Sequence, residues 1–135
     1  MLNTLIIDDE AHIRDTLTKL LSRNCPAVRV VGEASGVAEG IKAIQTLHPG
    51  LVLLDVNMKD GTGFDLLHSL DTVDFKIIFI SACDKNSIQA YRLSGMEYLL
   101  KPVNPVELMA ALRKVADTGQ EDIILQMKAL DTNLE

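Results

Sequence analysis

The fold is decided by one stretch of the chain, LVLLDVNM at residues 51–58. Its first four residues are apolar, and a short unbroken apolar run is typical of a strand that is buried on both faces of a parallel sheet. The run ends in a carboxylate, Asp55. Ligands of open α/β sheets bind at the carboxyl ends of the strands, although an aspartate at a strand end often serves only a turn. The role of Asp55 therefore depends on what the other strand ends carry.

Length and composition predict a single globular domain. The chain has 135 residues, of which 47% are hydrophobic and 24% charged, and its formal net charge is -6; these values are ordinary for a soluble domain. The acidic balance argues against a basic surface that binds nucleic acid. No apolar run approaches the ~20 residues of a membrane span, and the N-terminus shows no signal-peptide pattern. We therefore expect a cytoplasmic protein that does not bind membranes, with Cys25 and Cys83 as free thiols.

Strand and helix patterns alternate along the chain. Apolar runs predict strands at residues 2–7, 28–34, 51–55, 76–80 and 98–100. Apolar residues at helical spacing predict helices at residues 11–22, 37–47, 64–70, 84–93 and 105–117. Ser35 is the expected cap of the second helix, and Asn104 with Pro105 should begin the last one. Five βα units in succession predict an α/β domain with a parallel sheet and helices on both faces.

Chemically active side chains follow four of the predicted strands. Asp8 and Asp9 follow the first strand, Asp55 ends the third, Ser81 follows the fourth, and Lys101 follows the fifth. Parallel strands present their carboxyl ends at one edge of the sheet, so we expect these side chains to lie together. Three carboxylates in one crevice repel one another unless a cation neutralises them, and Mg²⁺ binds carboxylate and phosphate oxygens. An aspartate can also act as a nucleophile and form an aspartyl-phosphate, so the set predicts Mg²⁺-dependent phosphoryl transfer with Lys101 as a further positive charge.

The chain resembles the receiver domains of two-component response regulators. The resemblance covers about residues 2–117 and rests on DDE at 8–10, Asp55 with Met58 and Gly63, SA at 81–82, and YLLKP at 98–102. It implies a flavodoxin-like, CheY-like (βα)5 doubly wound parallel sheet with strand order 2-1-3-4-5. It also implies a signalling domain that takes a phosphoryl group from a sensor histidine kinase in a phosphorelay and is not an enzyme beyond its own phosphorylation and dephosphorylation.

The resemblance assigns a role to each of these site residues. Asp55 is the expected phosphoacceptor. Asp8, Asp9 and Asp55 are expected to bind Mg²⁺ together with the backbone carbonyl of Asn57. Lys101 is expected to bind the phosphate, and the peptide bond that follows it is usually cis in this family.

The resemblance also implies how the signal would leave the site. Ser81 and Tyr98 match the two residues that move when the family's phosphoacceptor is phosphorylated. Their movement is expected to change the face formed by the fourth helix, fifth strand and fifth helix, roughly residues 86–114. We expect this face to form a homodimer in the phosphorylated state.

A narrower likeness is to receivers of the LytR/AlgR type, on IFISA at 78–82, SIQAY at 87–91 and YLLKP at 98–102. Such regulators usually carry a LytTR DNA-binding domain after the receiver. We therefore expect a receiver over residues 1–118 and a linker helix or tail over residues 119–135, leading toward an effector domain absent from this chain. Any contact with DNA, and any regulation of transcription, would belong to that effector.

Three positions depart from the family's pattern, the first of them Gly50, where an aspartate often precedes Leu51. Lys59 stands where a proline usually follows the methionine, and the loss of proline is expected to loosen the loop beside Asp55. Ser81 replaces the commoner threonine but keeps the hydroxyl group. None of the three changes removes an essential chemical group.

The sequence alone leaves three alternative functions to consider. A haloacid dehalogenase-type phosphatase also uses an aspartate after a strand, but it wants a second acid where this chain has Asn57. A flavodoxin-like nucleotide or flavin binder would want a glycine-rich phosphate loop where the chain has three acids at 8–10. A degenerate receiver that acts only as a dimerisation module would not need the full set of site residues.

Overall fold

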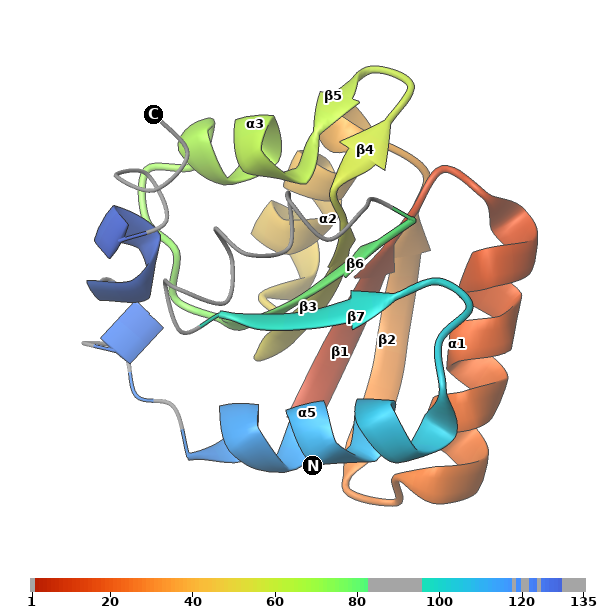
Figure 1. Cartoon of the computed structure of the whole chain (residues 1–135). Helices are drawn as coiled ribbons and strands as arrows, with labels where there is room; N and C mark the ends of the chain where they lie inside the picture. Colours follow the sequence, from red (N-terminus) through yellow and green to blue (C-terminus); the bar gives the residue numbers. More distant parts are fainter. Residues whose placement is uncertain (1, 83–95, 118, 120–121, 124, 130–135) are drawn as a thin grey trace.

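The computed structural model describes residues 2–82, 96–117, 119, 122–123 and 125–129. Its helices and strands follow one another along the chain as in Figure 1. In order they are β1 (Leu2–Ile7), α1 (Ala11–Asn24), β2 (Val28–Ala34), α2 (Val37–Leu47), β3 (Leu51–Asp55), β4 (Asn57–Met58), β5 (Gly61–Thr62), α3 (Gly63–His68), β6 (Lys76–Ser81), β7 (Glu97–Leu100) and α5 (Pro105–Ala116). The helix expected at residues 84–93 lies outside the described residues.

The main sheet has five parallel strands in the order β2-β1-β3-β6-β7. Because β4 and β5 form a separate two-stranded sheet, β6 and β7 are the fourth and fifth strands, and the predicted order 2-1-3-4-5 is confirmed. The register pairs Ile7 with Leu54 and Asp55 with Ile80. Asp8, which follows β1, and Ser81, the last residue of β6, therefore stand beside Asp55 at one edge of the sheet.

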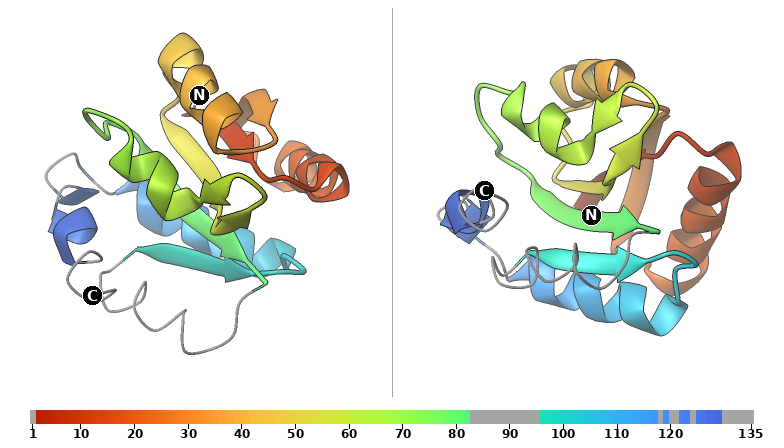
Figure 2. Two further views of the ribbon diagram at one scale, coloured as in Figure 1. Left: turned by 90° about the horizontal axis from the view of Figure 1, so that it is seen from above. Right: turned by 45° about the horizontal axis from the view of Figure 1, so that its top comes forward.

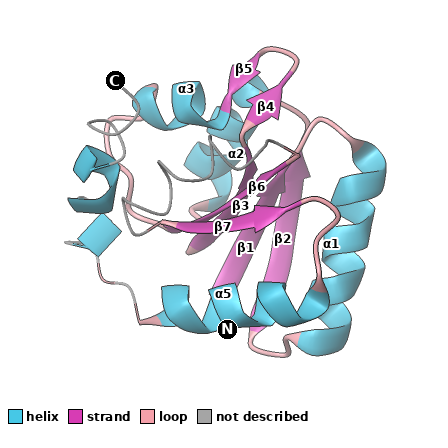
Figure 3. Cartoon of the chain, viewed as in Figure 1, coloured by secondary structure: helices cyan, strands magenta, loops and turns pink. Residues whose placement is uncertain are grey.

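Strand β3 lies at the centre of the sheet and is buried along its whole length. Val52 and Leu54 pack in the layer toward α2 and α3, whereas Leu51 and Leu53 pack in the layer toward α1 and α5. Figures 2 and 3 show these helices covering the two faces of the sheet. The unbroken apolar run is thus explained by apolar layers on both faces, as predicted.

Helix α5 begins as the sequence predicts. The side-chain oxygen of Asn104 accepts hydrogen bonds from the backbone N–H groups of Val106 at 2.8 Å and Glu107 at 3.4 Å. Pro105 is the first residue of the helix, where its missing N–H costs no hydrogen bond.

Helix α2 begins differently from the prediction, and the expected Ser35 cap is wrong. The residue before the helix is Gly36, which makes no side-chain cap. The first two N–H groups, of Val37 and Ala38, instead donate to the carboxylate of Asp60 at 2.8 and 3.2 Å. Asp60 lies in the turn between β4 and β5, so a distant segment supplies the cap that a local residue was expected to supply.

The C-terminal segment packs against the sheet domain. Its described residues 122–123 and 125–129 are helical. Ile123 is only 4% exposed, and Met127 packs against the apolar layer on the side of α2 and α3. Within the described part of the chain, no helix is both long enough and apolar enough to cross a membrane.

Candidate metal and phosphoacceptor site

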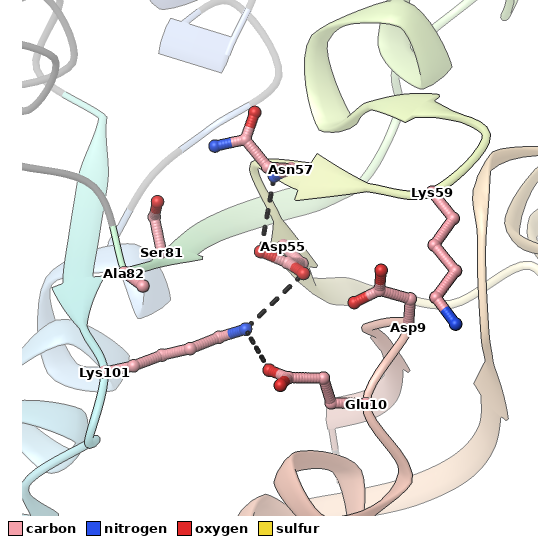
Figure 4. Close-up of a pocket in the computed structure, with 8 residues that line it drawn as sticks. All are labelled: Asp9, Glu10, Asp55, Asn57, Lys59, Ser81, Ala82 and Lys101. Atoms are coloured by element: carbon pink, nitrogen blue, oxygen red, sulfur yellow. Dashed lines mark hydrogen bonds and ion pairs between the residues drawn. The ribbon is translucent and has the colours of Figure 1, made fainter.

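The predicted site residues meet at the carboxyl edge of the sheet. A pocket of about 540 Å³ opens there and is drawn in Figure 4. The residues that line it are Asp9, Glu10, Asp55, Asn57, Lys59, Ser81, Ala82 and Lys101. The pocket therefore unites side chains at the carboxyl ends of β1, β3, β6 and β7 with the hairpin of β4 and β5.

Three carboxylates of the site lie within reach of one cation. One carboxylate oxygen from each of Asp8, Asp9 and Asp55 lies within 4.8 Å of the other two. Asp8 and Asp55 are 1% and 3% exposed, while Asp9 is partly exposed. Buried carboxylates at this spacing repel one another strongly. Their oxygen-only donor set fits a hard divalent ion such as Mg²⁺.

Lys101 provides the buried positive charge among these acids. Its ammonium nitrogen lies 2.9 Å from Asp8 Oδ2, 3.2 Å from Glu10 Oε2 and 3.5 Å from Asp55 Oδ2. Burial alone would lower the pKa of Lys101, but the hydrogen bond to Asp8 and the charges of Asp55 and Asp8 outweigh it and raise the pKa to about 12. Lys101 therefore stays protonated at neutral pH.

The position of Lys101 is set by the end of β7. Its backbone N–H donates to the carbonyl of Ser81 at 2.9 Å, which ties it to the end of β6. The peptide bond between Lys101 and Pro102 is cis, as the family resemblance implies.

The surroundings of the Asp55 carboxyl group oppose its ionisation. Burial raises the pKa of Asp55, the negative charge of Asp8 raises it further, and Lys101 opposes both; the pKa reaches about 7. The backbone N–H of Asn57 lies 3.4 Å from Asp55 Oδ1 and favours the charged form weakly. A cation bound beside Asp55 would favour the carboxylate, which is the nucleophilic form.

Asp8 is positioned by groups whose roles the sequence did not reveal. Its Oδ1 accepts from the backbone N–H of Glu10 at 2.8 Å. The Arg14 guanidinium donates to the Asp8 carbonyl at 2.6 Å and pairs with Glu33 at 3.2 Å. Arg14 lies only six residues after Asp8, but its sequence position does not show where its side chain points. That direction depends on Glu33, which β2 places within 3.2 Å of Arg14.

The two residues expected to act as a switch lie on neighbouring strands. Ser81 is fully buried at the end of β6. Tyr98 on β7 is paired with Phe79 on β6 and packs against the layer on the side of α2 and α3, with its hydroxyl oxygen buried. Cys83, which the sequence places near this edge, lies outside the described residues.

The segment after Asp55 forms an antiparallel hairpin. Asn57 pairs with Thr62 and Met58 with Gly61, and the turn between them consists of Lys59 and Asp60. The loosening expected from the loss of proline stays a prediction, and the hairpin has several anchors. The carboxylate of Asp60 accepts two N–H groups from α2, and these hydrogen bonds lower the pKa of Asp60.

The far end of the hairpin is anchored by α3. Thr62 and Asp65 form a reciprocal capping box: the Thr62 N–H donates to Asp65 Oδ2 at 2.8 Å, and the Asp65 N–H donates to Thr62 Oγ1 at 3.0 Å. Gly61 has a φ of 144°, which side-chain-bearing residues rarely adopt. The hairpin that carries Lys59 is therefore held at both of its ends.

Comparison with known proteins gives consistent results. Residues 4–113 match the response regulator receiver domain family. The chain is 40% identical over 128 residues to an uncharacterized response regulatory protein of Vibrio parahaemolyticus, covering 93% of this chain and 52% of that protein. It is 32% identical over 127 residues to the transcriptional regulatory protein BtsR of Escherichia coli, covering 93% of this chain and 53% of BtsR.

A solved structure is similar over most of its length. The REC domain of AraT, a response regulator from Geobacillus stearothermophilus, superimposes with a TM-score of 0.72 at 29% identity, covering 84% of this chain and 92% of that one. The chain spans about half the length of the curated relatives it matches.

Proposed function

The chain belongs to the response regulator receiver domain family, and on that premise we propose that it takes a phosphoryl group from a sensor histidine kinase on Asp55. A receiver domain is a signalling module of two-component systems and not a catalytic enzyme. One observation carries the proposal: three carboxylates within 4.8 Å of one another meet a buried lysine in one pocket. Repulsion within this group is relieved when a cation binds, and the cation together with Lys101 then offsets the charge of an incoming phosphoryl group.

Asp8, Asp9 and Asp55 would hold Mg²⁺, together with the backbone carbonyl of Asn57. The bound ion supplies charge neutralisation at the phosphoryl oxygens. A carboxylate oxygen of Asp55 attacks the phosphorus of the phosphohistidine as the phosphorus–nitrogen bond breaks. The imidazole leaves with that electron pair and takes up a proton. Lys101 then pairs with one phosphoryl oxygen as a point charge, and the Ser81 hydroxyl donates to another.

The output would pass from Ser81 to Tyr98. A phosphoryl group on Asp55 gives Ser81 a new acceptor, and Tyr98 on the next strand responds to the space that Ser81 leaves. A hydrogen bond contributes only about 1 kcal/mol net, so the phosphoryl group shifts a balance between states that are close in energy. The face of residues 86–114 would then form a symmetric homodimer.

The finer domain assignment also belongs to this proposal. Residues 1–118 would be the receiver, and residues 119–135 would lead to an effector domain. The transcriptional regulator BtsR is about twice as long as the match, and the likeness to LytR/AlgR-type receivers favours a LytTR DNA-binding domain as the effector. Such a regulator would act on transcription in the cytoplasm, with DNA contacts confined to the effector.

The test is phosphorylation by acetyl phosphate followed by intact mass. Wild type should gain one phosphoryl group in the presence of Mg²⁺ and none with a chelator. Asp55→Asn should gain none, whereas Asp71→Asn, which changes an exposed acid outside the pocket, should behave as wild type. Undiminished labelling of Asp55→Asn would exclude Asp55 as the phosphoacceptor.

The metal site is tested separately by titration calorimetry. Asp9→Asn removes the partly exposed member of the acidic group and should weaken Mg²⁺ binding strongly relative to Asp71→Asn. Equal Mg²⁺ affinity in the two variants would exclude the metal site at these residues.

A further inference from the structure

Lys59 and Lys101 both line the pocket, but they lie in different surroundings. Lys101 is 12% exposed and is engaged by Asp8, Glu10 and Asp55. Lys59 is exposed. Figure 4 shows it extending from the hairpin along the side of the pocket opposite Lys101. The two ammonium groups therefore meet an incoming ligand at different stages: Lys59 at the mouth and Lys101 at depth.

The hairpin holds the backbone of Lys59 in this place. The preceding residue, Met58, is paired with Gly61. The following residue, Asp60, is bonded to the first turn of α2 through two backbone N–H groups. A side chain at position 59 must therefore leave the turn beside the pocket, and a proline there would bring no charge.

The charges around the mouth give Lys59 a task that Lys101 cannot perform. A phosphodonor approaching from solvent meets the partly exposed Asp9 and Glu10, which repel an anion. Lys101 pairs with Glu10 at 3.2 Å, but its single charge is shared with the buried Asp8 and Asp55 and leaves Asp9 without a paired cation from this lysine. An exposed cation at the rim attracts the donor over a range set by ionic strength. The same charge repels a divalent cation that enters by the same mouth.

We propose that Lys59 is a specificity-determining residue of this pocket: it favours phosphodonors of higher negative charge and weakens the binding of free Mg²⁺. The inference rests on the proposed phosphorylation of Asp55. It predicts opposite changes in two affinities from a single substitution. Loss of packing or of hairpin structure would impair both, so the opposite signs distinguish charge from structure.

The experiment compares Lys59→Ala with Lys42→Ala. Lys42 is exposed on α2 and does not line the pocket, so the control makes the same change in net charge. Phosphorylation rates are measured by intact mass against the concentration of acetyl phosphate, which carries two negative charges near neutral pH, and of phosphoramidate, which carries about one. Mg²⁺ affinity is measured by titration calorimetry without a phosphodonor.

Lys59→Ala should raise the half-saturating concentration of acetyl phosphate roughly three- to fivefold at low salt, with little change in the maximal rate. The increase should be smaller for phosphoramidate and should fade toward ~0.5 M salt. The same variant should bind Mg²⁺ about twofold more tightly. Lys59→Arg should restore wild-type values, and Lys42→Ala should match wild type throughout.

Several results would overturn the inference. One is equal behaviour of Lys59→Ala and Lys42→Ala. Another is an equal loss for both phosphodonors through the maximal rate, which would mean that Lys59 only shapes the hairpin. Weaker Mg²⁺ binding in Lys59→Ala would also contradict it. Failure of the proposed function is recognised separately, because wild type would then not be phosphorylated while the calorimetric comparison could still be made.

Discussion

The pocket has two regions that carry similar charges with different consequences. We call Asp55 and Lys101, together with the buried Asp8 that pairs with Lys101, the pocket floor, and the hairpin of residues 57–62 the pocket rim. On the floor, burial and close approach raise the pKa of Asp55 to about 7 and that of Lys101 to about 12. On the rim, Asp60 is exposed. Its pKa is lowered, chiefly because its carboxylate accepts hydrogen bonds from two N–H groups of α2.

The difference shows how burial changes the value of a charge. Water and salt screen charges on the rim, where an exposed pair contributes little to stability. Charges on the floor are coupled strongly enough that binding a cation or a phosphoryl group alters the balance of the whole site. The floor is therefore suited to the chemistry, and the rim to setting which ligand arrives.

The largest loss of stability is expected where the rim joins the floor, at Gly63. A Cβ at this residue would lie 2.6 Å from the backbone oxygen of Asp55 and 2.9 Å from the side chain of Leu54. Because the backbone of the central strand cannot yield, Gly63→Ala should lower the free energy of unfolding by about 3 kcal/mol and impair phosphorylation. Urea unfolding measures the first effect and intact mass the second.

Gly119→Ala is the matched control, because a Cβ there meets only Asp122, at an ordinary 3.8 Å. Equal stability of the two variants would mean that the hairpin can shift without disturbing the floor. The rim would then move independently of the floor, in addition to differing from it in the burial of its charges.

The second prediction is a pH dependence that arises on the floor. The ordinary pKa of Asp55 is 3.8 and its folded value is about 7, so between these values the folded state binds more protons than the unfolded state. In metal-free buffer the contribution of Asp55 to stability is therefore fully present below about pH 4 and is lost as the pH rises to about 7. Asp55→Asn should gain stability over wild type as the pH rises across this window, and the gain should approach about 4 kcal/mol at its upper end, because the pKa is raised by about three units at ~1.4 kcal/mol each.

This gain is measured as the difference between two urea-unfolding series over pH, one for each protein. Saturating Mg²⁺ should shrink it, because the ion relieves the repulsion that ionised Asp55 suffers. A difference that does not change with pH would contradict the raised pKa of Asp55.

The third prediction concerns the buried lysine of the floor. The pKa of Lys101, about 12 against an ordinary 10.5, corresponds to about 2 kcal/mol of favourable interaction near neutral pH. Lys101→Met keeps an apolar stem of similar length, and Asp55 can take up a proton when the cation is lost. We therefore expect a loss of about 1–2 kcal/mol in metal-free buffer, measured by urea unfolding.

Lys114→Met is the comparison for this variant, since Lys114 is exposed and lies 3.9 Å from Glu97. It should be close to neutral. If Lys101→Met and Lys114→Met lowered the free energy of unfolding equally, burial would not explain the contrast between floor and surface.

The smallest effect is expected on the rim, at Asp60. Asp60→Ala removes the acceptor for the N–H groups of Val37 and Ala38, so amide hydrogen exchange at these two residues should become faster. The melting temperature should fall less than in Gly63→Ala or Lys101→Met, and that of Asp60→Asn, which keeps an acceptor oxygen, should fall less still. Unchanged exchange at both amides would show that the hairpin does not cap α2.

Much of the site could be predicted because its residues are tied to strand ends. Once the apolar run of β3 was recognised, the alternation of strands and helices placed Asp8, Asp9, Asp55, Ser81 and Lys101 at one edge, and the structure brings them there. The start of α5 was also predictable, because Asn104 and Pro105 act on N–H groups within three residues. Their assigned chemical roles stay predictions until phosphorylation and Mg²⁺ binding are measured.

What the sequence determined by itself is therefore local: periodicity sets the elements, and short-range capping sets some of their ends. Tertiary structure decided the pairings between distant segments. Asp60 caps a helix 23 residues earlier in place of the expected Ser35, and Lys101 meets Glu10 across 91 residues of chain. Such contacts depend on how strands are ordered and how a hairpin is tilted over the sheet. No local pattern encodes them, because the energy of each depends on neighbours that only the folded chain brings together.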